Sequence, residues 1–151
     1  MPVERIGLVP FEVRKEPWNE YKIKDKEDVV LRGRFIVTKF VRIRDTESPK
    51  RIGLQVGSTP IWVTYSPPGI RDKPSERLPP VNEIKEEEKK NMEVEIVKED
   101  WNIYRIPEDN RILRFRLIVA RVFRVLGYFS SDEEPYYIVE STGLLEESKE
   151  D

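Results

Sequence analysis

The feature that most constrains this chain is an internal duplication. Residues 12–23 and 95–106 are identical at seven of twelve positions, and residues 31–43 and 113–125 are identical at six of thirteen. The copies are 83 residues apart in the first block and 82 in the second, so one residue was gained or lost between the blocks. Self-similarity of this kind predicts two tandem copies of one small unit.

Alternating apolar and polar residues predict that both copies are built from β-strands. Residues 21–24 and 104–106 alternate with period two, which places Tyr and Ile on one face and basic residues on the other. Turn-forming residues follow at 25–28 and 107–110, directly before a long β-branched run. We therefore expect a β-hairpin in each copy.

A last strand is expected near the end of each copy. Residues 60–66 and 135–141 resemble each other weakly, each beginning with Pro and ending with Ser. The segments before them, 44–59 and 126–134, contain glycine and polar residues and are interpreted as exposed loops of unequal length. Residues 52–56 are a candidate for a short extra strand.

The long second block has one apolar face that a single cation interrupts in each copy, Lys39 and Arg121. A β-bulge there would shift the phase and turn the cation to solvent. The alternative is a symmetric pair of cations that binds an anionic partner in a central cavity. The opposite face has an apolar centre at 36–40 and at 118–122, and we expect some other part of the assembly to cover it.

The expected fold class is all-β, with two tandem copies of a three- to four-stranded unit forming a pseudo-twofold barrel or sandwich. The boundaries are a first repeat at 1–68, a linker rich in proline and charge at 69–91, a second repeat at 92–145 and an acidic tail at 146–151. A unit of this size is too small to be stable alone, so we expect the repeats to share one core.

The residue inventory limits the chemistry that this chain can perform. There is no cysteine and no histidine, which excludes thiol nucleophiles, Ser-His-Asp triads and histidine zinc sites. No carboxylate pair is distinguished by its spacing, and no calcium or phosphate-binding motif is present. We therefore expect no catalytic residue, metal or cofactor, and the sequence favours a protein that is not an enzyme.

The repeated Trp-Asn-x-Tyr motif at Trp18 and Trp101 has two interpretations. It is either a stacking platform for a base or sugar beside phosphate-binding arginines, or the corner of a turn that anchors the core. The corner is favoured, because large aromatic side chains are ordinarily core anchors. The candidate ligand-binding residues are Trp18, Asn19, Arg32, Arg34, Lys39, Trp101, Asn102, Arg114, Arg116 and Arg121.

Composition favours a cytoplasmic protein of a thermophile, because charged residues make up 37% of the chain and no leader or long apolar run is present. The net charge of −2 disfavours general nucleic-acid affinity but allows a local basic patch. Two functions remain. The first is a non-catalytic binding or assembly protein that contacts a protein partner or its own copies through β edges, with no membrane partner. The alternative is a small protein that binds nucleic acid or an anionic ligand on a basic and aromatic β surface.

Overall fold

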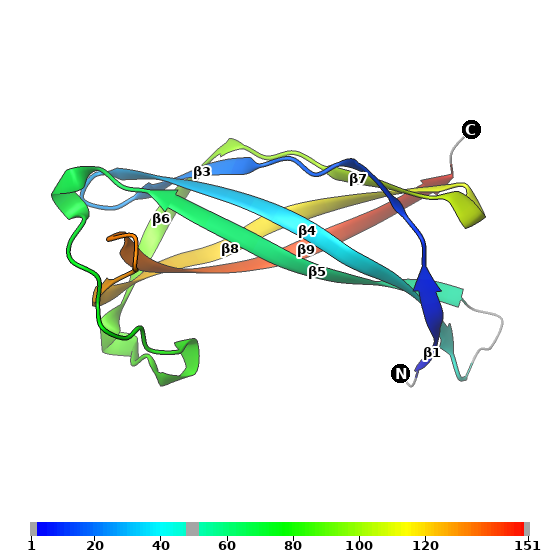
Figure 1. Cartoon of the computed structure of the whole chain (residues 1–151), viewed down its shortest axis with the longest axis horizontal. Helices are drawn as coiled ribbons and strands as arrows, with labels where there is room; N and C mark the ends of the chain where they lie inside the picture. Colours follow the sequence, from blue (N-terminus) through cyan, green and yellow to red (C-terminus); the bar gives the residue numbers. More distant parts are fainter. Residues whose placement is uncertain (1–2, 48–51, 150–151) are drawn as a thin grey trace.

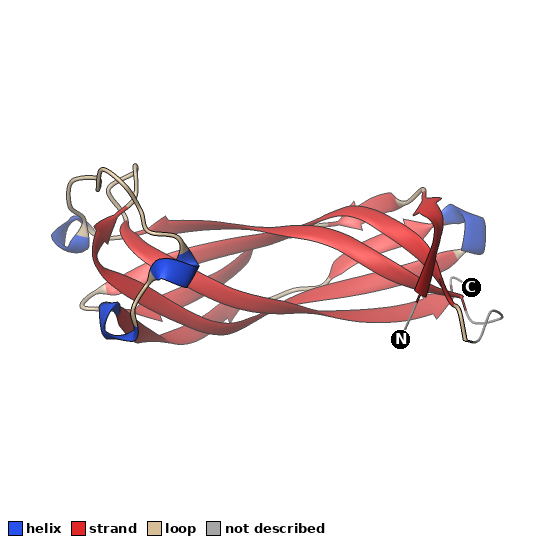
Figure 2. Ribbon diagram, turned by 90° about the horizontal axis from the view of Figure 1, so that it is seen from below, coloured by secondary structure: helices blue, strands red, loops and turns tan. Residues whose placement is uncertain are grey.

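The computed structural model describes residues 3–47 and 52–149 and is all-β. The described chain forms an elongated molecule whose strands run along its length, with short helical turns at both ends (Figures 1 and 2). The strands are β1 (Val3–Val9), β2 (Glu12–Lys15), β3 (Asn19–Lys24), β4 (Asp28–Asp45), β5 (Ile52–Tyr65), β6 (Lys89–Lys98), β7 (Asn102–Ile106), β8 (Arg111–Phe129) and β9 (Pro135–Lys149). Single turns of 3-10 helix lie at Pro68–Ile70, Val81–Glu83, Glu86–Glu88 and Pro107–Asp109.

All strand pairs are antiparallel and form one sheet with the order β1-β4-β3-β6-β8-β7-β2. β5 lies off this path as a further partner of β4, and β9 as a further partner of β8. The order ends at β1 and β2, so strand pairing leaves the sheet open, and a closed barrel or a sandwich is not shown. Only Pro10 and Phe11 separate these two edge strands along the chain.

The predicted hairpins are confirmed, as β3 pairs with β4 and β7 pairs with β8. The loops predicted at 44–59 and 126–134 are too long, because β5 is one continuous strand from Ile52 and β8 continues to Phe129. Long regular pairing along β4 and β8 extends the strands through these glycine-containing segments.

The strand register also corrects the weak similarity between residues 60–66 and 135–141. Pro60 lies opposite Phe35, whereas Leu117, the counterpart of Phe35 in the repeat, lies opposite Gly143. Pro60 therefore corresponds in position to Gly143 and not to Pro135.

The β-bulges predicted at the two interrupting cations are confirmed. The register shifts between Val37 and Lys39, and between Val119 and Arg121. The phase change leaves Lys39 and Arg121 exposed and turns Phe40 and Val122 into the core, both with no exposed surface. The alternative interpretation, a pair of cations in a central cavity, is therefore wrong, because both side chains are exposed on the surface.

The bulge also corrects the expectation that the apolar strand centres need a cover. Phe40 and Val122 belong to the interior, so they leave the outer face. Ile118 stays on that face and is 37% exposed, with exposed Ala120 beside it. Beyond the bulge of β8, Ile84 of the linker packs with Phe123.

The two largest core clusters both contain residues from each half of the chain. One contains Tyr104, Ile106 and Leu113 together with Phe35 and Phe40. The other contains their sequence counterparts Tyr21, Ile23 and Leu31 together with Met92 and Val122. The rings of Phe35 and Phe115 stack at a centroid distance of 4.7 Å and join β4 to β8.

Two glycines leave room for aromatic rings in this core. The Trp62 ring occupies the space in which a Cβ on Gly33 would lie, and the Phe115 ring does the same at Gly143. A larger residue at either position would have to displace a ring, because protein interiors are close-packed.

The C-terminal residues differ from the expected acidic tail. Residues 146–149 belong to β9, and Glu146 and Glu147 form ion pairs with Arg114 and Arg111 of β8. Residues 150–151 lie outside the described range. None of the helical turns in the described chain has the length or apolar character needed to cross a membrane.

Candidate functional site

β4 has a gap in its strand pairing, and side chains fill it. β3 pairs with residues 28–33 of β4 and β1 with residues 40–45, while β5 occupies the other edge along most of the strand. Within the gap, Asn102 Nδ2 donates to the Phe35 carbonyl at 2.6 Å, and the Val37 N–H donates to Glu16 Oε2 at 3.1 Å. Backbone groups that lack a strand partner are thereby satisfied.

A buried network joins these two side chains. The Tyr104 hydroxyl donates to Glu16 Oε2 at 2.8 Å and accepts from Asn102 Nδ2 at 2.8 Å. The Glu16 side chain is only 8% exposed, with Arg34 at 3.7 Å. Burial, and next the hydrogen bond to Glu16, raise the pKa of Tyr104 far above its usual value, so the phenol stays protonated.

The second copy has a matching network. The Glu99 side chain is 6% exposed, accepts from the Tyr21 hydroxyl at 3.1 Å and binds Arg116 Nε at 2.9 Å. Burial, followed by the charge of Glu99, raises the pKa of Tyr21. Each buried carboxylate thus binds a tyrosine from the other copy.

Arginines cover the tryptophan of each corner. The Arg32 guanidinium lies 4.9 Å from the centroid of the Trp18 ring, and Arg34 lies 6.0 Å from it. Around Trp101 the same distances are 4.4 Å for Arg114 and 5.7 Å for Arg116. Arg34 and Arg116 each lie beside both a tryptophan and a buried glutamate, which is an arrangement that stabilises the corner.

The asparagines of the motif are buried, with Asn19 at 1% and Asn102 at 3% exposure. Asn19 Oδ1 accepts from the Asp100 N–H at 2.9 Å, and Asn102 is bound to β4 as described above. Lys39 and Arg121 lie apart from the corners at the bulges, and Arg121 is bound to Glu140 at 2.7 Å. The structure therefore brings the tryptophan of each copy together with two of the predicted arginines. The asparagines are instead buried, and Lys39 and Arg121 lie at the bulges.

A groove of about 690 Å³ lies beside Trp18, on the outer face of β3 and β4. Arg32 and Lys98 are its cations, and Tyr65, which is 54% exposed, is its second aromatic side chain. The complete lining is Pro17, Trp18, Glu20, Val30, Arg32, Tyr65 and Lys98.

The corresponding surface beside Trp101 carries the equivalent cations, Lys15 and Arg114, but carboxylates neutralise them. Lys15 binds Asp100 at 2.6 Å, and Arg114 binds Glu146 at 3.6 Å. The hydrogen bond from Lys15 is the main reason why the pKa of Asp100 lies below its usual value.

The groove beside Trp18 has neither of these carboxylates. Pro17 occupies the sequence position that corresponds to Asp100, and Val63 lies opposite Arg32 where Glu146 lies opposite Arg114. Within residues 3–47 and 52–149, no carboxylate oxygen lies within 4.0 Å of the charged nitrogens of Arg32 or Lys98. Tyr65 replaces Ser148, since these residues lie opposite Val30 and Ile112.

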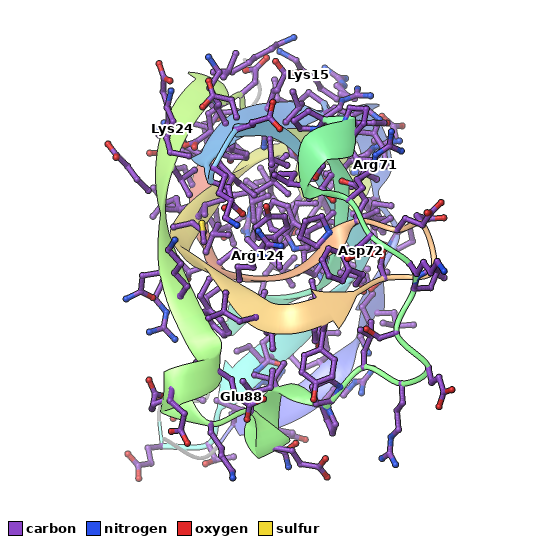
Figure 3. All side chains as sticks on the ribbon, turned by 90° about the vertical axis from the view of Figure 1, so that its left-hand side faces the viewer. Lys15, Lys24, Arg71, Asp72, Glu88 and Arg124 are labelled. Atoms are coloured by element: carbon purple, nitrogen blue, oxygen red, sulfur yellow. The ribbon has the colours of Figure 1, made fainter. Side chains whose placement is uncertain are left out.

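A second hollow of about 480 Å³ lies at the end of the molecule shown in Figure 3. Its walls include Tyr65, Arg71 and Tyr136, with Asp132 and Glu134 of the β8–β9 turn. Tyr65 lines both hollows, so the groove and the end hollow are neighbours.

A buried ion pair lies next to the end hollow and contacts Tyr137, which lines it. Asp25 Oδ2 accepts from the Tyr137 hydroxyl at 2.6 Å and binds Arg124 at 3.0 Å, and the Asp25 side chain is only 1% exposed. Burial alone would raise the pKa of Asp25, but hydrogen bonds from Tyr137 and the Lys26 N–H, with the charge of Arg124, hold it below its usual value.

Sequence reasoning missed Lys98 and Tyr65. A comparison of the copies offered one signal for Lys98: the lysine is present in both copies, but Pro17 stands where the other copy has Asp100. In the described part of the chain, no group of three or more His, Cys, Asp or Glu residues could hold a metal ion. No protein-family model matches the chain, and neither the curated proteins nor the solved structures contain a match.

Proposed function

We propose that this is a non-catalytic binding protein that takes up an anionic ligand with a planar ring in the groove beside Trp18. The ligand class is a nucleotide or a short single-stranded segment of nucleic acid. The observation that carries the proposal is the difference between the surfaces beside the two tryptophans: Lys15 and Arg114 beside Trp101 form ion pairs with Asp100 and Glu146. Arg32 and Lys98 beside Trp18 have no carboxylate oxygen of the described residues within 4.0 Å.

The groove has the two properties that such a ligand requires. Arg32 and Lys98 lie opposite Glu20 of β3 on either side, so the three side chains leave one net positive charge for a phosphate. The exposed Tyr65 provides a stacking surface for a base. The Arg32 guanidinium lies over the Trp18 ring, and this cation–π contact orients the side chain without neutralising its charge. The small net charge of −2 is compatible with a local site but not with extended electrostatic binding.

The test is tryptophan fluorescence during titration with hexathymidylate at several salt concentrations. Arg32→Ala and Lys98→Ala are each expected to weaken binding about tenfold, and to reduce the salt slope by about 0.7 for each phosphate that the variant no longer binds. The physical reason is that each substitution removes one groove cation that has no carboxylate oxygen of the described residues within 4.0 Å.

The equivalent surface beside Trp101 supplies matched controls for this experiment. Arg114→Ala and Lys15→Ala remove the equivalent cations, but both of these are already neutralised by Glu146 and Asp100. They are expected to leave the affinity unchanged. Equal losses for the variants beside Trp18 and those beside Trp101, or no salt-dependent binding by the unaltered protein, would refute the proposal.

Assembly through strand edges has weaker support. β5 carries no charged residue and pairs only with β4 in the described chain, which leaves one edge open. The Phe35 carbonyl accepts a hydrogen bond from Asn102 on the side away from β5. Phe35 and Pro60 are therefore a non-hydrogen-bonded pair, and their backbone polar groups point away from each other. Pro60 then leaves the open edge without a donor near its centre, which disfavours strand addition.

We also propose that the two repeats act as one pseudo-twofold unit with a shared core, in which β1 and β2 together complete a barrel-like enclosure. Three kinds of paired contact support it. β2 binds β7 as β6 binds β3, Glu16 binds Tyr104 as Glu99 binds Tyr21, and Arg42 binds Asp109 as Arg124 binds Asp25.

Cutting the chain between Arg77 and Leu78 tests this arrangement. Each fragment alone is expected to be unfolded by circular dichroism, because each loses buried residues of both large core clusters to the other fragment. Mixing the fragments is expected to restore a cooperative thermal transition. A fragment that folds cooperatively by itself with the stability of the intact chain would exclude the shared core.

A further inference from the structure

The groove and the end hollow meet at a single side chain. Tyr65, the last residue of β5, lines both of them and is 54% exposed. A ligand that stacks on its ring in the groove therefore reaches the end hollow without crossing another element.

The end hollow has a cation of its own. Arg71 lines it, and no carboxylate oxygen of the described residues lies within 4.0 Å of its charged nitrogens. Its neighbours hold its backbone in place: Ile70 is buried in the core, and the Asp72 N–H donates to the Glu133 carbonyl at 3.3 Å. Figure 3 shows Arg71 and Asp72 on the segment that crosses this end of the molecule.

The remaining walls supply a ring and acceptors. Tyr136 is held by its hydroxyl, which donates to the Pro79 carbonyl at 3.0 Å. Asp132 and Glu134 line the hollow, and Glu134 already accepts from the Ser66 hydroxyl at 2.7 Å. These carboxylates repel phosphate, so among the described lining residues Arg71 is the one cation that can attract an anion.

We propose that the groove and the end hollow form one site for a single-stranded nucleic acid of more than one nucleotide, which bends around Tyr65 and places a second phosphate at Arg71. This inference rests on the proposed function. Its cations are then Lys98, Arg32 and Arg71, and its stacking surfaces are Tyr65 and Tyr136.

The experiment compares thymidine monophosphate with hexathymidylate on the full chain. Hexathymidylate is expected to bind about tenfold more tightly, because it makes an additional phosphate and base contact. Arg71→Ala is expected to remove this advantage and to lower the salt slope for hexathymidylate by about 0.7, while binding of the monophosphate stays unchanged. Tyr65→Ala is expected to weaken both ligands.

Arg77→Ala is the matched control, because it removes the same charge from an exposed position of the same segment that lines neither hollow. If Arg71→Ala leaves hexathymidylate binding unchanged while Arg32→Ala weakens both ligands, the extended site is overturned and the proposed function stands. If neither ligand binds the unaltered protein, the proposed function fails and the extended site fails with it.

Discussion

An Asp25→Asn variant is expected to lose about 3 kcal/mol of unfolding free energy at neutral pH, because it leaves Arg124 as an unpaired and largely buried cation. The Arg124 side chain is 12% exposed and that of Asp25 is 1% exposed, so water cannot replace the missing partner. Urea denaturation of the variant and the unaltered protein measures this difference.

The loss is also expected to depend on pH. The folded pKa of Asp25 lies below its ordinary value of 3.8, so the stabilisation is complete above that value and fades as the pH falls through the folded pKa. The gap between variant and unaltered protein should therefore narrow in acid. A gap that is the same at pH 7 and about pH 2 would contradict this account.

The second copy again provides a control. Asp109→Asn breaks the matching contact with Arg42 at 2.8 Å, but both of these side chains are 22% exposed and Arg42 keeps Glu108 at 3.4 Å. The expected loss is below about 1.5 kcal/mol, since a partly hydrated cation with a second partner tolerates the change. Equal losses at Asp25 and Asp109 would show that burial does not decide the effect.

A Glu16→Leu variant is expected to lose about 3 kcal/mol of unfolding free energy, because the Val37 N–H and the Tyr104 hydroxyl both lose their acceptor. Glu16→Gln keeps an acceptor oxygen and is expected to cost about 1 kcal/mol. Hydrogen exchange at the Val37 amide should become faster in the leucine variant, since that amide lies in the gap of strand pairing.

Glu12→Leu is the control for this substitution. Glu12 lies on the neighbouring strand β2 and pairs with Arg105 at 3.6 Å, but its side chain is 53% exposed. A surface pair of this kind contributes less than about 1 kcal/mol. If Glu12→Leu destabilises as much as Glu16→Leu, the buried network is not the cause.

The duplication allowed much of the fold to be predicted. It identified both hairpins and the two bulges, because repeated turn residues and a cation on an apolar face are local signals. The lengths of β5 and β8 were not predictable, since pairing with a neighbouring strand carried them through glycine-containing segments that have no strand signal of their own.

The candidate site was predictable only in part. Trp18 and Arg32 were named from the motif and do lie together in the groove. Lys98 and Tyr65 come from β6 and β5, and only the pairing of β3 with β6 and of β4 with β5 brings them beside Trp18. No local pattern encodes that proximity.

By itself, the sequence determined the repeat, the strand periodicity and the chemistry that is excluded, because these depend on residue identity and short-range spacing. Only the tertiary structure decided that Glu16 and Glu99 are buried hydrogen-bond acceptors and that the groove beside Trp18 keeps two cations without a carboxylate of the described residues within 4.0 Å. Both properties depend on which distant side chains surround a group, since hydration and nearby charge determine whether a carboxylate is a core acceptor and whether a cation is available to a ligand.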